Sequence, residues 1–189
     1  MKTEAQIEAF IPGVVIFDPA VLSRFIAEHC PDDSNVFEIF VEQSNIGSLA
    51  VQSGAVVPMY PIPEENYVFR LRDERMRPFE QSNEAVFRYE DIPLNVVSGL
   101  LLIADLHALM DWDPEFFLNY KARLSDRLGN NDYLDIEPGF YSLSITGFNQ
   151  LGAELSQNVY QLGVTAVESL PAVPNGANFD RWDFRIERL

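Results

Sequence analysis

Residues 137–148, with the sequence EPGFYSLSITGF, alternate between apolar and polar side chains, and this period of two constrains the fold more than any other stretch. In an extended chain Tyr141, Leu143 and Ile145 share one face, while the hydroxyl-bearing residues between them share the other. The Pro-Gly pair before them is typical of a turn. A strand needs neighbours to satisfy its backbone groups, so this stretch predicts a sheet with further strands beside it.

Other runs of the chain repeat the same alternation. We expect strands at residues 37–42, 55–60, 67–72, 85–89, 133–136, 159–168 and 182–187. Residues 96–110 fit both an apolar strand and a helical spacing, and we favour a strand over 96–104 followed by a loop. In the last run, Trp182, Phe184 and Ile186 alternate with charged residues, which predicts one buried face and one charged face.

Two Asp-Pro pairs mark the starts of the helices that we expect. An aspartate can accept hydrogen bonds from the free N–H groups of a first helical turn, and proline is tolerated at the first helical position. Asp18 therefore begins a helix over residues 19–28, and Asp113 begins one over residues 114–128.

Many strands and two helices predict a mainly β protein of the α+β class. We expect an antiparallel β-sandwich or barrel with two packed helices, formed by residues 1–189 as a single domain. A parallel α/β sheet is disfavoured, because it needs a helix between most pairs of strands.

The charge balance narrows the choice of partners. The chain carries 29 acidic residues against 13 lysines and arginines, a net charge of −16. Such a field repels nucleic-acid phosphates and anionic lipids, so we expect no direct nucleic-acid binding and no membrane binding. It attracts a basic protein, although acidity that serves only solubility is the alternative. Five of the 11 arginines lie within residues 70–88, the only basic patch in the middle of the chain.

Cysteine usage and hydropathy indicate the compartment. Cys30 is the only cysteine, which excludes an internal disulfide and suits a reducing environment. The first residues lack the apolar core of a secretory signal, and no apolar run approaches the roughly 18 residues that a transmembrane helix needs. We therefore expect a cytoplasmic protein.

Residue patterns for catalysis are sparse. Two histidines and one cysteine cannot supply the clustered ligands of a structural zinc site, and no nucleophile elbow or glycine-rich phosphate loop is present in the sequence. His107 lies near Asp105 and Asp111, a combination that could bind a hard cation or act in acid/base chemistry. We expect no cofactor, and we favour a protein that is not an enzyme while leaving the question open.

Two acidic segments remain as candidates for binding a basic partner. Trp112 lies between two aspartates just before a predicted helix, where an exposed aromatic ring would anchor such a partner. The predicted contact residues are Asp105, Asp111, Trp112, Asp113, Glu115, Asp132, Asp135 and Glu137.

One short motif adds a resemblance. Glu137, Pro138, Gly139, Phe140 and Tyr141, within an acidic β-rich chain, resemble small bacterial nuclease-inhibitor and toxin-immunity proteins, including the competence-associated nuclease inhibitors. The resemblance implies a non-enzymatic protein that binds and masks a toxin or a nuclease. It offers no residue pattern from which individual roles could be transferred.

Three hypotheses of function follow. The first is an acidic immunity or inhibitor protein that masks a basic toxin or nuclease. The second is a small-molecule-binding or metal-binding protein, or a hydrolase-like enzyme, with its site near His107. The third is a structural protein that self-associates, with the strand predicted at residues 182–187 pairing across a homodimer.

Overall fold

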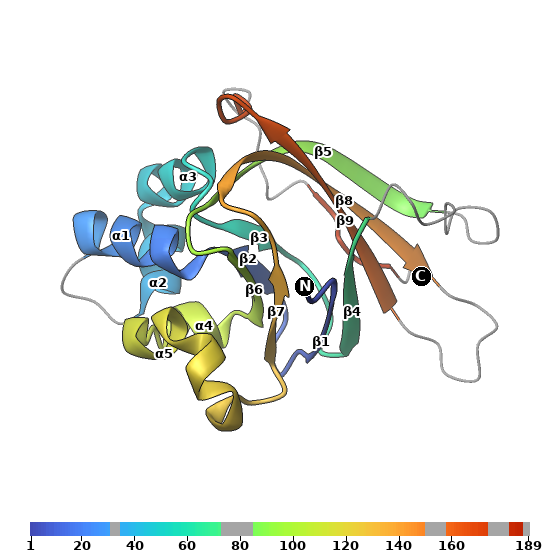
Figure 1. The fold of residues 1–189 in the computed structure, drawn as a ribbon, viewed down its shortest axis with the longest axis horizontal. Helices are drawn as coiled ribbons and strands as arrows, with labels where there is room; N and C mark the ends of the chain where they lie inside the picture. The colour runs from blue at the N-terminus through green and yellow to red at the C-terminus, as the bar shows by residue number, and fades with distance from the viewer. Residues whose placement is uncertain (31–34, 73–84, 150–157, 174–181, 187–189) are drawn as a thin grey trace.

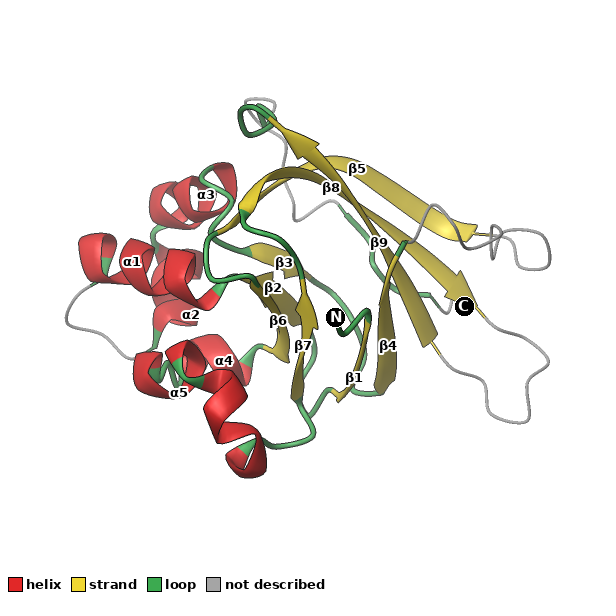
Figure 2. Cartoon of the chain, viewed as in Figure 1, coloured by secondary structure: helices red, strands yellow, loops and turns green. Residues whose placement is uncertain are grey.

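The computed structural model stacks two β-sheets and a layer of helices (Figure 1). It describes residues 1–30, 35–72, 85–149, 158–173 and 182–186. The helices cover the outer face of the smaller sheet, whose other face packs on the larger sheet (Figure 2).

The larger sheet has five strands in the order β1-β4-β9-β8-β5. Neighbouring strands are antiparallel except β4 and β9, which pair in parallel. The strands are β1 (Glu4–Glu8), β4 (Asn66–Leu71), β5 (Ala85–Val96), β8 (Gly139–Asn149) and β9 (Asn158–Val167).

The smaller sheet has four antiparallel strands in the order β3-β2-β6-β7. They are β2 (Val14–Phe17), β3 (Val57–Met59), β6 (Leu100–Asp105) and β7 (Asn131–Asp135). Every residue of β2 and β6 is buried, because both faces of this sheet are covered. Leu101 and Ile103 point into the core between the sheets, whereas Leu100 and Leu102 pack with the helices.

The helical layer contains more helices than the two that the sequence predicts. It comprises α1 (Pro19–His29), α2 (Val36–Glu42), α3 (Ser44–Gln52), α4 (His107–Met110), α5 (Pro114–Leu118) and the 3-10 helix η2 (Tyr120–Asp126). The predicted class, mainly β and α+β, is confirmed. The two sheets remain open, so the arrangement is a sandwich with a helical layer and not a barrel.

The prediction of a strand over residues 37–42 is wrong, because this stretch forms α2. Asn35 caps the helix, its side-chain oxygen accepting a hydrogen bond of 3.2 Å from the backbone N–H of Glu38. Val36, Phe40 and their apolar neighbours pack in the helical core. The run is apolar at nearly every position, so it fits a helix as well as a strand, and tertiary packing decides between them.

The long helix predicted over residues 114–128 is interrupted. α5 ends at Leu118, and Asn119 leaves helical geometry with φ −105° and ψ 20° before the 3-10 helix begins. Tyr120 is buried, and its hydroxyl donates a hydrogen bond of 2.7 Å to the side-chain oxygen of Asn131 in β7. Leu124 and Leu128 follow Tyr120 at the spacing of an apolar stripe on the predicted helix, but both are exposed.

The strand predicted at residues 182–187 does not form over the described residues 182–186. Its apolar alternation is nevertheless used, since Phe184 and Ile186 are buried in the core between the sheets. The backbone carbonyl of Phe184 accepts a hydrogen bond of 2.8 Å from the Tyr160 hydroxyl. Residue 187 lies outside the described residues, and self-association through this segment stays a prediction.

Asp18 links the helical layer to the sheets. Its Oδ1 accepts hydrogen bonds from the backbone N–H groups of Ala20 (2.8 Å) and Val21 (3.0 Å), which caps α1. Its Oδ2 accepts from the backbone N–H of Val97 (2.9 Å), and from the backbone N–H and hydroxyl of Ser98 (both 2.7 Å). The carboxylate is fully buried, so these donors replace its water.

The two Asp-Pro caps provide a matched pair of variants. Asp18→Ala should lower the free energy of unfolding by about 3 kcal/mol or more, because it leaves buried backbone donors without an acceptor. Asp113→Ala removes an exposed cap and should cost only about 1 kcal/mol. Urea unfolding followed by circular dichroism measures both, and equal costs would contradict the assigned role of Asp18.

Candidate protein-binding surface

The first predicted acidic segment begins inside the protein. Asp105 ends β6 and is fully buried. Its Oδ1 accepts hydrogen bonds from the His107 backbone N–H (3.1 Å) and the Asn130 side-chain amide (2.8 Å), and its Oδ2 accepts from the Phe10 backbone N–H (3.0 Å). Asp105 therefore joins three segments of the chain, and its burial leaves no surface for the partner contact that we expected of it.

His107 stands at the start of α4 with its ring partly exposed. Its Nδ1 lies 3.2 Å from Oδ2 of Asp105, an arrangement that can orient the imidazole. Asp111 follows one turn later, and its backbone N–H donates to the His107 carbonyl (2.9 Å). Within the described ranges no group of three His, Cys, Asp or Glu side chains could hold a metal ion. Chemistry at His107 stays a prediction.

The carboxylates of the α4–α5 segment are exposed and close in sequence. Asp113 caps α5, its Oδ1 accepting a hydrogen bond of 3.0 Å from the Phe116 backbone N–H. Asp111 and Glu115 are exposed and form no ion pair in the part of the chain that the structure describes. Three predicted contact residues thus lie on the surface within five positions.

Trp112 corrects the expectation of an exposed anchor. Its side chain is only 9% exposed. The indole stacks on Phe117 at 5.1 Å between ring centroids and meets the edge of Phe17 at 5.8 Å. Trp112 therefore fastens α5 to β2, and the two flanking aspartates point outward because the indole points inward.

Asp132 in the second acidic segment is also buried. Its Oδ1 contacts Nζ of Lys2 and a guanidinium nitrogen of Arg127, each at 2.5 Å. Its Oδ2 accepts from the Gln6 backbone N–H at 3.0 Å. This carboxylate ties β1 and the end of η2 to β7, so its charge is neutralised and it is not available to a partner.

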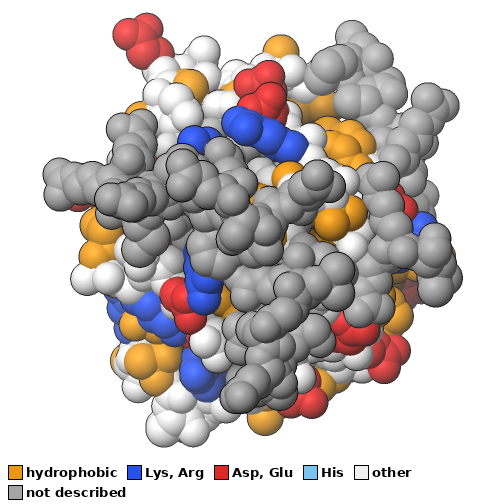
Figure 3. Space-filling model, turned by 90° about the vertical axis from the view of Figure 1, so that its right-hand side faces the viewer, with side chains coloured by type: hydrophobic (Ala, Val, Ile, Leu, Met, Phe, Trp, Pro, Cys, Tyr) orange, Lys and Arg blue, Asp and Glu red, His pale blue; other side chains and the backbone are white. Residues whose placement is uncertain are grey.

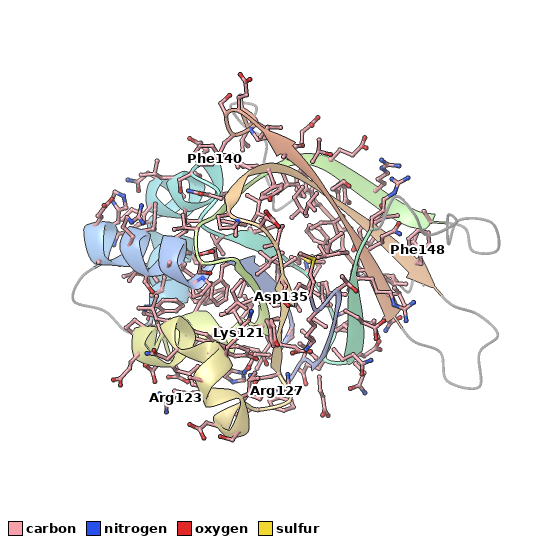
Figure 4. The ribbon with its side chains drawn as sticks, in the orientation of Figure 1. Lys121, Arg123, Arg127, Asp135, Phe140 and Phe148 are labelled. Atoms are coloured by element: carbon pink, nitrogen blue, oxygen red, sulfur yellow. The ribbon has the colours of Figure 1, made fainter. Side chains whose placement is uncertain are left out.

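Asp135 is only partly exposed and is also paired. Its Oδ1 accepts from Nζ of Lys121 (2.5 Å) and its Oδ2 from the backbone N–H of Lys2 (2.7 Å) (Figure 4). The hydrogen bond from Lys121, and after it the one from the Lys2 backbone, hold the pKa of Asp135 below its usual value. Nearby, burial raises the pKa of the Tyr120 hydroxyl to about 12.

Glu137 lies on the surface two residues before β8 begins. Its backbone carbonyl accepts a hydrogen bond of 2.8 Å from the Tyr141 hydroxyl, which fixes the Pro-Gly turn. Its carboxylate is exposed, and so is the neighbouring Phe140 (Figure 4). Of the eight predicted contacts, the structure leaves Asp111, Asp113, Glu115 and Glu137 fully on the surface.

Most of the described lysines and arginines pair with carboxylates of the same chain. Lys2, Arg70, Arg88, Lys121, Arg123, Arg127 and Arg185 all form ion pairs with carboxylates. Figure 3 shows one face on which blue and red side chains lie next to one another. In the basic patch of residues 70–88, Arg70 pairs with Glu4 and Arg88 with Glu90, while Arg75 and Arg77 fall outside the described residues. The excess of acid is therefore carried by the surface.

Two further aromatic residues lie on the surface: Tyr60, whose sequence position allows either a core or an interface role, and Phe10, which the sequence analysis missed. Phe10 and Tyr60 are 43% and 55% exposed. A signal was present for Phe10: positions 4–9 alternate between outward and buried side chains, and position 10 continues the outward face. A phenylalanine on the polar face of such a run departs from the pattern that burial requires.

Comparisons with known proteins give two structural matches. No family model and no curated sequence matches the chain. It is similar in structure to ComJ from Bacillus subtilis, described as an inhibitor of the DNA-degrading activity of NucA. The TM-score is 0.44, the identity 11%, and the match covers 87% of this chain and 95% of ComJ. It is also similar to the protein of crocagin biosynthetic gene J, with a TM-score of 0.45, 14% identity, and 86% and 96% of the two chains covered.

The first match is to a protein that is described as a nuclease inhibitor. The second match is to a protein named for a biosynthetic gene. At these TM-scores and identities, neither match carries a function over to this chain. In the part of the chain that the structure describes, no helix is long and apolar enough to cross a membrane.

Asp135→Asn should show a stability loss that depends on pH. The folded-state pKa of Asp135 lies below the unfolded value, so its contribution is fully present above about pH 4 and disappears as pH falls through the folded pKa. We expect a loss of about 1 kcal/mol at pH 7 that shrinks by pH 3, measured by urea unfolding. Asp111→Asn is the control and should change stability by less than about 0.5 kcal/mol at both pH values.

Proposed function

We propose that this protein is a non-enzymatic binding protein whose acidic surface engages and masks a basic protein, such as a nuclease or a toxin. The observation that carries the proposal is the group of exposed carboxylates on the α4–α5 segment, Asp111, Asp113 and Glu115. The first and last form no ion pair in the described structure, although seven of the described cations do pair with carboxylates.

The distribution of charge supports this proposal. With a net charge of −16 and most described cations neutralised locally, the field around the surface is negative. Such a field accelerates the encounter with a basic partner and repels acidic competitors. Exposed carboxylates without partners keep their charge available for a cation of another protein.

The rigidity of the α4–α5 segment supports it further. Trp112 and Phe117 hold α5 against β2, and the side chain of Asp113 caps the helix. Buried Asp105 accepts a hydrogen bond from the backbone N–H of His107 and so holds the start of α4 in place. Because the backbone that carries the carboxylates is already ordered, little conformational entropy would be lost on binding. The nuclease or toxin class of partner comes from the sequence resemblance at residues 137–141.

A charge-reversal experiment tests the proposal. Wild-type protein is used to capture basic proteins from the lysate of its source, and the retained protein is purified and titrated against variants at about 0.15 M salt. Asp111→Lys with Glu115→Lys should weaken binding roughly 30-fold, at ~1 kcal/mol for each reversal. Glu42→Lys with Glu168→Lys makes the same change of net charge at two other exposed positions, and should weaken binding far less.

Two results would contradict the proposal. In the first, wild-type protein retains no basic protein at physiological salt, in which case the acidity serves solubility. In the second, both pairs of substitutions weaken binding equally, in which case only the net charge acts and the α4–α5 carboxylates form no specific surface.

A further inference from the structure

The exposed rings of Phe10 and Tyr60 come from two neighbouring segments of the chain. Residues 9–13 and 60–65 run side by side, with hydrogen bonds from the Ala9 N–H to the Glu65 carbonyl (2.9 Å) and from the Gly13 N–H to the Ile62 carbonyl (3.0 Å). These segments extend the pairing of β1 with β4 beyond the sheet. We call Phe10 and Tyr60, with the exposed carboxylates of Glu8 and Glu64, the aromatic surface.

The backbone beneath the aromatic surface is firmly held. The N–H of Phe10 donates to the buried carboxylate of Asp105, the same oxygen that His107 Nδ1 approaches. Gly13 has a φ of +103°, and a Cβ there would lie 3.2 Å from the ring of Tyr60 and 2.7 Å from Leu106. Glycine is therefore needed at position 13 both for its backbone conformation and for the close approach of Tyr60.

Neither ring has a stacking partner or a cation within the described structure. Other surface aromatics do attract cations: Lys2 lies over Tyr133 at 4.5 Å, and Arg123 lies over Phe116 at 5.3 Å. Phe10 and Tyr60 have no such neighbour, although ordered aromatic faces bind cations favourably. Both side chains are therefore partly accessible to a cation from outside the chain.

Acidic residues lie along the same segments. Glu8 and Glu64 are exposed and form no ion pair among the described residues. The N–H of Glu8 donates to the Gly129 carbonyl (2.9 Å), which brings the exposed Leu128 beside it. Aromatic rings next to free carboxylates match the two features of a guanidinium group, a flat face that stacks and a charge that pairs.

We propose that the aromatic surface binds arginine side chains of a basic protein partner, with Phe10 and Tyr60 stacking on guanidinium groups and Glu8 and Glu64 pairing with their charge. This inference rests on the proposed function and names the chemistry of the partner. Lysine, a compact and strongly hydrated charge, gains less from a ring face, so the surface distinguishes arginine from lysine where carboxylates alone would not.

Peptides of equal charge test this preference. Fluorescein-labelled nona-arginine and nona-lysine are titrated into the protein at about 0.15 M salt, and binding is followed by fluorescence anisotropy. Wild-type protein should bind nona-arginine about fivefold more tightly, which corresponds to ~1 kcal/mol. Phe10→Leu with Tyr60→Leu keeps apolar side chains and the net charge, and should abolish the preference while changing the nona-lysine affinity less than about twofold.

Phe140→Leu is the matched control. Phe140 is 42% exposed, close to the value for Phe10, and lies in β8, which pairs with β5 and β9 and not with β1 or β4. This substitution should leave the preference for arginine unchanged. Because all three rings are exposed, unchanged circular dichroism and thermal unfolding are expected and are measured first.

The outcomes separate this inference from the proposed function. If both peptides bind equally well, or if the preference survives in the Phe10→Leu and Tyr60→Leu variant, the inference is overturned. The proposed function is then still judged by the captured protein and the Asp111 and Glu115 reversals. If sedimentation shows a wild-type dimer that the aromatic substitutions dissociate, the surface binds a second copy of the chain, which also overturns the inference.

Discussion

Three buried carboxylates hold the loops of this protein in place, and the arrangement of its layers depends on them. Asp18 joins the start of α1 to the turn between β5 and β6, and Asp105 joins the segment at Phe10 to α4 and Asn130. Asp132 joins β1 and η2 to β7. A carboxylate is stable inside a protein only where donors replace its water, so each of the three fixes every segment that supplies a donor. The apolar cores supply the driving force, but these carboxylates set how the loops meet the sheets.

The acidic residues therefore fall into two groups that the sequence does not separate. Burial of Asp105 depends on donors from residues 10 and 130, which are distant along the chain, so no local pattern could reveal it. The helix caps are different, because Asp18 and Asp113 act on N–H groups two or three residues away and were predictable from the Asp-Pro pairs. Removing the buried carboxylates from the predicted contact set leaves a smaller surface group, and buried Asp105 accepts a hydrogen bond at the start of α4, just before part of that group.

Strands were predictable where one face is apolar and the other polar, as in β8, β4 and β9. An alternation of apolar and polar residues predicts strands less well where successive residues are all apolar. The apolar run that forms α2 also fits a strand, which is why the sequence prediction there was wrong. The helix predicted after Asp113 did not take into account the hydrogen bond that Tyr120 makes with Asn131 in β7. Residues 182–186 keep the alternation of a strand and bury apolar side chains, but they do not form a β-strand. An alternating pattern therefore predicts which side chains are buried more directly than it predicts strand pairing.

The alternation of outward and buried side chains also makes the position of Phe10 unusual. Along residues 4–9 every second side chain faces outward and is polar or charged, and the pattern places position 10 in the same row. A phenylalanine in that row that is 43% exposed forgoes part of the stabilisation that full burial would give. Asp105 nevertheless accepts a hydrogen bond from the backbone N–H of Phe10, so the backbone that carries the exposed ring is held in place. An ordered, exposed aromatic residue beside free carboxylates is poorly explained by folding alone, and its chemistry suits recognition of a cationic side chain.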